Sequence, residues 1–155
     1  MADVHPLLAP TLYSYTQARE DLAHWTEGFT VEQIWSRPHG LAPLGFQLKH
    51  IAGSVERLTA YLSGGELNQQ QLDAIQHEMD PAPGREELLQ IVDNSFRASE
   101  KVILALSPAD LSQPRKVGRQ HLSTTVGGLL VHLAEHTQRH VGEAIITAKL
   151  ARMLK

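Results

Sequence analysis

Residues 126–148 read VGGLLVHLAEHTQRHVGEAIITA, and their apolar side chains recur at spacings of three and four residues. This period is that of one face of an α-helix. Ser123 or Thr124, just before the stretch, is a suitable N-cap residue. We therefore expect a long helix that starts near residue 123 and runs to the C-terminus.

The same periodicity predicts three further long helices, over residues 9–28, 44–63 and 85–106. The polar residues 66–84 are expected to form a long crossover with one helical stretch, and residues 109–122 a second, irregular connection. Convincing strand alternation is found nowhere. The sequence predicts an all-α fold, a four-helix bundle with long crossover connections.

Composition limits the class of protein. The 155 residues are 42% hydrophobic and 20% charged, which predicts a single globular domain over residues 1–155. A net charge of -3 without a polybasic run argues against a nucleic-acid partner. No leader-like segment and no apolar run of about 18 residues is present, so we expect no membrane partner and a cytoplasmic location.

The long C-terminal helix carries a row of histidines. His132, His136 and His140 stand four residues apart, which places them within a strip about 80° wide. Two imidazoles at this spacing can bind one metal ion from the same side. His136 and His140 border the apolar stripe, whereas His132 leans toward its rim. A third ligand must come from another helix, and the candidate is His50, on the flank of the apolar stripe of the helix predicted over residues 44–63.

The histidine pair could also have a purely structural role. A pair of histidines four residues apart can be solvated, or can pack as satisfied polar residues at the edge of a core. The metalloprotease pattern HExxH is excluded, because Leu133 follows His132 and Thr137 follows His136. The remaining histidines stand singly and are expected at the surface: His5, His24, His39, His77 and His121. With no cysteine in the chain, any metal must take nitrogen or oxygen ligands.

Beyond these patterns, the chain resembles the DinB-like superfamily of metal-dependent enzymes, which includes the YfiT-like proteins and the mycothiol-dependent isomerases. Three motifs carry the resemblance: IWSRP at 34–38, LGFQLKHIAG at 44–53 and LVHLAEHTQRHVGE at 130–143. In that family one histidine of the second helix and an HxxxH pair of the last long helix bind a divalent metal. The resemblance implies His50, His136 and His140 as the metal ligands.

Two positions near this trio need a separate interpretation. Many relatives have Gln where this chain has Glu143, and we favour a solvated position for Glu143 over one that supports the metal. His132 is interpreted as a residue that supports a ligand, not as a ligand itself. Farther away, the basic cluster from Arg115 to His121 is expected to be a solvated loop, although it could attract an anionic substrate, and Trp35 is expected to pack in a connector.

The first hypothesis for function is a metal-dependent enzyme. A zinc or nickel ion on the three histidines would activate water or an exogenous low-molecular-weight thiol toward a small-molecule substrate, in hydrolysis or thiol transfer. The alternative is a non-catalytic bundle that binds partners or forms a homodimer, with a vestigial or regulatory metal site. DNA association, suggested only by the family's name, is not expected at this net charge.

Overall fold

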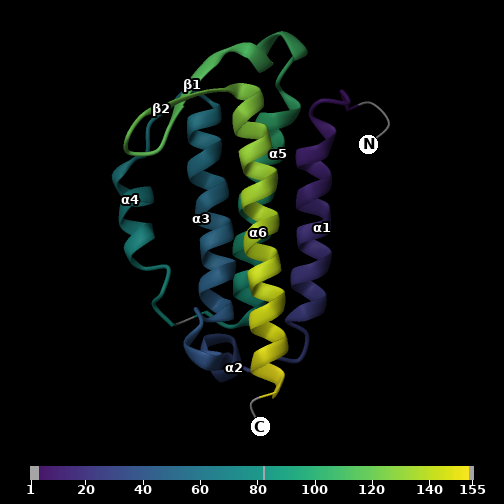
Figure 1. Ribbon diagram of the computed structural model, residues 1–155, viewed down its shortest axis with the longest axis vertical. Helices are drawn as coiled ribbons and strands as arrows, with labels where there is room; N and C mark the ends of the chain where they lie inside the picture. The colour runs from purple at the N-terminus through teal and green to yellow at the C-terminus, as the bar shows by residue number, and fades with distance from the viewer. Residues whose placement is uncertain (1–3, 82, 154–155) are drawn as a thin grey trace.

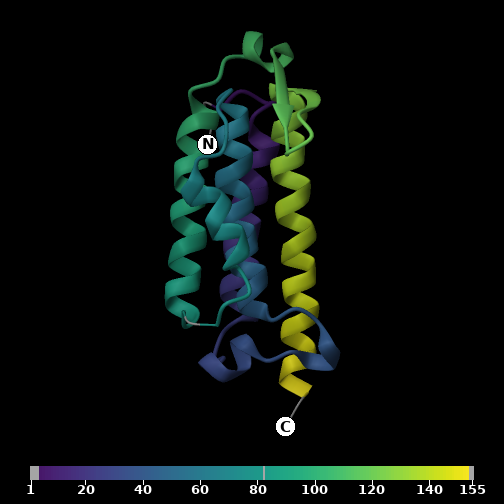
Figure 2. The same ribbon diagram turned by 90° about the vertical axis from the view of Figure 1, so that its left-hand side faces the viewer.

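The computed structural model describes residues 4–81 and 83–153, and four long helices stand side by side in it (Figure 1). These are α1 (Ala9–Trp25), α3 (Leu44–Leu62), α5 (Arg85–Leu104) and α6 (Val126–Met153). α6 packs against α1 and α3, and α3 also packs against α5. α1 and α6 run in one direction, and α3 and α5 run in the other (Figures 1 and 2). The predicted all-α four-helix bundle is confirmed.

A long crossover makes the parallel arrangement of α3 and α5 possible. After α3 the chain returns along the outside of the bundle through the short helix α4 (Gln69–Gln76), and α5 then starts again at the same end as α3 (Figure 2). The Asn68 side chain accepts a hydrogen bond from the Gln71 backbone N–H and so caps α4. Three shorter elements complete the connections: α2 (Val31–Trp35), η1 (Pro38–Gly40) and η2 (Pro108–Ser112).

The connection between α5 and α6 was expected to be irregular and free of strands, and that expectation is wrong. It contains a small antiparallel hairpin of β1 (Pro114–Val117) and β2 (Leu122–Thr125), in which Lys116 lies opposite Ser123. Each strand is four residues long, which is too short for an alternating pattern to stand out in the sequence. The turn uses positive φ at Gly118 (73°) and His121 (49°).

The core lies between the inward faces of the four long helices. Tyr15 of α1 and Phe96 of α5 are fully buried and stack with ring centroids 4.4 Å apart. The Tyr15 hydroxyl lies 3.0 Å from Ser99 Oγ, which also accepts a hydrogen bond from Thr59 Oγ1 of α3 at 2.9 Å. Among the described residues, no helix combines enough length with enough hydrophobicity to span a bilayer.

Candidate metal centre

α3 and α6 bring three histidines together at mid-bundle. One ring nitrogen from each of His50, His136 and His140 lies within 4.8 Å of the other two. The Nε2 atoms of His50 and His136 are 3.3 Å apart, and the ring of His140 is centred 4.3 Å from that of His50 and 4.6 Å from that of His136. The juxtaposition arises because the buried faces of the two helices pack together beside these residues. Residues far apart in sequence thus meet at one point.

Burial keeps two of these imidazoles neutral. Burial, followed by the neighbouring His140 and His50, lowers the pKa of His136 to about 4. The pKa of His140 is also lowered, first by burial and then by His50. A neutral ring offers a nitrogen lone pair, which is the form that binds a metal.

His50 is held by the buried carboxylate of Glu78. Its Nδ1 lies 2.7 Å from Glu78 Oε2, and the other carboxylate oxygen of Glu78 accepts a hydrogen bond from Arg57 Nη1 at 2.9 Å. Burial raises the pKa of Glu78, but the bond with His50 and the charge of Arg57 outweigh it, so the pKa is lowered overall. Because the ionised carboxylate accepts the Nδ1 proton, Nε2 of His50 keeps its lone pair toward the other two rings.

His140 is oriented by a second pair of side chains. Its Nδ1 lies 2.9 Å from Oε1 of the buried Gln47, and Gln47 Nε2 donates to Glu143 Oε2 at 3.0 Å. The same Glu143 oxygen is 3.2 Å from His140 Nδ1. The Glu143 side chain is 49% exposed, so it is solvated as expected and yet contacts a residue of the cluster. With Nδ1 occupied by these acceptors, Nε2 is the nitrogen of His140 left for a metal.

His132 lies outside this trio. Its Nε2 is 3.9 Å from Glu135 Oε1, and its ring is centred 5.6 Å from that of His136. His132, Glu135 and His136 form a second set of ligand atoms within 4.8 Å of one another. The side chains of His132 and Glu135 are about two-fifths exposed, and Arg139 donates to the other oxygen of Glu135 at 2.5 Å.

The solitary histidines and Trp35 take the places expected of them, whereas Arg115 and Lys116, expected in a loop, lie in strand β1. The five solitary histidines are all exposed: His5, His24, His39, His77 and His121. Trp35 packs against Gly45 of α3, and its Nε1 donates to the Pro83 carbonyl at 2.9 Å. The tryptophan therefore ties the connector to the end of the crossover that supplies Glu78.

Sequence reasoning missed the side chains that surround the trio. Glu78 stands in the polar crossover, 28 positions after His50, with no local pattern to mark it. Gln47 does carry a signal, because it lies three residues before His50 and shares its side of the helix. Arg57, seven residues after His50, carries the same kind of signal.

Comparison with known proteins gives one clear result. The family model of the DinB superfamily matches residues 14–144, which is most of the chain and includes all three histidines and Glu78. No curated protein matches the chain. The bundle and the histidine cluster that fits a metal-binding site agree with this match. The chain belongs to the DinB superfamily.

Proposed function

We propose that the protein is a metal-dependent enzyme in which His50, His136 and His140 bind a divalent ion. The observation that carries the proposal is the convergence of three ring nitrogens within 4.8 Å, from two different helices. Two of these rings have Nδ1 bonded to Glu78 and Gln47, so the metal-binding nitrogen of each is already selected.

The donor set fits a borderline transition metal. Three neutral imidazoles suit zinc or nickel better than magnesium or calcium, which prefer oxygen ligands. Three protein ligands also leave a coordination position open, as in catalytic zinc sites. An ion held there would supply Lewis acidity, which lowers the pKa of a water molecule or a thiol and makes it a nucleophile at neutral pH.

The surrounding side chains set the geometry for this chemistry. Glu78 Oε2 accepts the Nδ1 proton of His50, and Gln47 Oε1 accepts that of His140. Arg57 holds Glu78 in its ionised form and donates from Nη2 to Ser54 Oγ at 3.1 Å. Ser54 Oγ in turn lies 3.3 Å from His50 Nε2, which places a hydroxyl beside the ligand nitrogens.

The reaction we propose is hydrolysis or thiol transfer on a small electrophile. The chain has no cysteine, so a sulfur nucleophile must come from a separate low-molecular-weight thiol. The half-buried histidines, with side chains of His50 and His140 that are 21% and 14% exposed, leave the cluster accessible to small molecules.

Metal content tests the ligand set. The parent protein and the His136→Ala and His132→Ala variants are loaded with zinc or nickel, desalted and measured by elemental analysis. We expect one tightly bound ion per chain in the parent protein and in His132→Ala, and loss of that ion in His136→Ala. Stoichiometric metal in folded His136→Ala would reject the trio. Activity is then measured with ester, amide and thiol-transfer substrates, with and without metal, and the absence of any metal-stimulated rate would reject the enzymatic role.

A further inference from the structure

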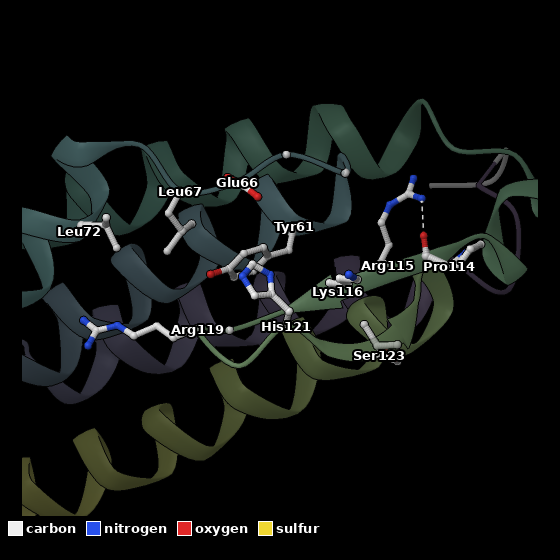
Figure 3. Close-up of a pocket in the computed structure, with 14 residues that line it drawn as sticks. Tyr61, Glu66, Leu67, Leu72, Pro114, Arg115, Lys116, Arg119, His121 and Ser123 are labelled. Atoms are coloured by element: carbon white, nitrogen blue, oxygen red, sulfur yellow. Dashed lines mark hydrogen bonds between the residues drawn. The ribbon is translucent and has the colours of Figure 1, made fainter.

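A second site lies beyond the histidine cluster, at the end of the bundle where the hairpin sits. A cavity of about 740 Å³ opens between three elements: the hairpin, helix α4 and the C-terminal end of α3 (Figure 3). Its lining divides into two chemical halves. Tyr61, Leu67 and Leu72 form the apolar part, and the hairpin contributes Arg115, Lys116, Arg119 and His121.

The hairpin half carries an excess of positive charge. Arg115, Lys116 and Arg119 fall within five residues of one another, in a chain whose net charge is -3. Within residues 4–81 and 83–153, no carboxylate forms a salt bridge with any of the three. Glu66 is the one acidic residue in the lining, so it cannot balance them. An anion in the cavity would therefore meet positive charge that no salt bridge balances.

Arg115 is already fixed in place at the rim. Its Nε donates to the Leu62 carbonyl at 2.8 Å, Nη1 to the Pro114 carbonyl at 3.0 Å and Nη2 to Gln113 Oε1 at 3.2 Å. Each terminal nitrogen of a guanidinium has two N–H groups, so one on each remains for another acceptor. An arginine held in this way loses little conformational entropy when it binds a carboxylate or a phosphate.

We propose that this cavity binds a small organic anion. Its apolar or aromatic body would lie against Tyr61, Leu67 and Leu72, and its carboxylate or phosphate group would face the basic residues of the hairpin. The volume falls within the range of small-molecule sites. A bare inorganic ion would leave the apolar half of the lining unused.

The site is separate from the histidine cluster. Tyr61 follows His50 by eleven residues on α3, which places it on nearly the same face of the helix but about 16 Å along its axis. A small anion bound at the hairpin therefore does not touch the histidines. The proposal does not depend on a metal, and it predicts that His136→Ala binds the anion as the parent protein does.

Titration with matched probes tests the proposal. Benzoate and phenyl phosphate are titrated into the full chain by calorimetry and by ¹H–¹⁵N NMR, with benzamide as the neutral analogue of benzoate and inorganic phosphate as the charge without the ring. We expect saturable binding of one or both organic anions, amide shifts confined to residues 61–72 and 114–124, and weaker binding of both comparison compounds. The anion that binds more tightly identifies the preferred acidic group.

Paired charge variants separate this site from general attraction to the surface. The double variant Lys116→Gln and Arg119→Gln should weaken anion binding by about ten-fold or more, because two cations facing the anionic group are lost. The double variant Arg97→Gln and Lys149→Gln makes the same change in net charge elsewhere and should bind as the parent does. The proposal is overturned if neither organic anion binds saturably, if benzamide or inorganic phosphate binds as tightly, or if both double variants behave alike while folded.

Discussion

Replacing Glu78 with glutamine keeps the shape of the side chain and removes the charge that orients His50. In the parent protein the carboxylate accepts from His50 Nδ1 at 2.7 Å and from Arg57 at 2.9 Å, in a site where the Glu78 side chain is only 8% exposed. A hydrogen bond to a charged group contributes about 1.5–3 kcal/mol and a neutral one about 0.5–1.5 kcal/mol. The loss of about 1–2 kcal/mol corresponds to a metal affinity about 5- to 30-fold weaker.

Competition with a chromophoric chelator measures this change. Zinc or nickel is partitioned between the indicator and the protein for the parent, for Glu78→Gln and for a control, Asp80→Asn. The control removes a carboxylate from the same connection, where Asp80 lies 2.7 Å from His77 Nδ1, but both of those side chains are more than three-fifths exposed. We expect Asp80→Asn to bind metal as the parent does. Parent-like affinity in a Glu78→Gln protein with unchanged helix content would refute the reasoning.

Three further predictions concern stability, measured by chemical denaturation. Gly45→Ala should destabilise the fold by about 1–3 kcal/mol, because its Cβ would lie 2.7 Å from the Trp35 ring, whereas Gly142→Ala meets no atom within 4 Å and should be neutral or stabilising. Asp93→Asn should lower stability at neutral pH. Burial raises the pKa of Asp93, but hydrogen bonds from two arginines outweigh it and lower the pKa. The deficit in stability relative to the parent should therefore shrink as the pH falls below about 4, where the carboxylate of the parent becomes protonated. No deficit at neutral pH would show that these hydrogen bonds contribute little to stability. Ser99→Ala removes a buried hydroxyl bonded to two others and should cost about 1–3 kcal/mol; no loss would show that the two partners find other acceptors.

The helices could be predicted because their signals are local. The apolar period predicted the end of α3 to within one residue, and the predicted third helix ran two residues past the end of α5 at Leu104. α1 was predicted to continue to Gly28, but it ends at Trp25, and Gly28 adopts a positive φ of 74° in the turn that follows. Ends of helices depend on turn geometry, which the periodicity of the apolar residues does not report.

The candidate site was predictable only in part, because some of its residues meet only through tertiary packing. The spacing of His136 and His140 lies within one helix and can be read directly, and both the helical position of His50 and the family resemblance pointed to that residue. Glu78 reaches His50 only because the crossover folds back along α3, which is a tertiary event with no sequence period. The ligand role of the trio remains a prediction that metal analysis can test.

The position of α6 has a consequence for synthesis on the ribosome. α6 packs against both α1 and α3, yet it begins at Val126, so the other three long helices are translated before it emerges. Until then the apolar stripes of α1 and α3 that face α6 stay open to solvent, and nascent chains arrested before this helix should be good clients for chaperones and proteases. Closure of the bundle is therefore completed only after α6 has left the exit tunnel.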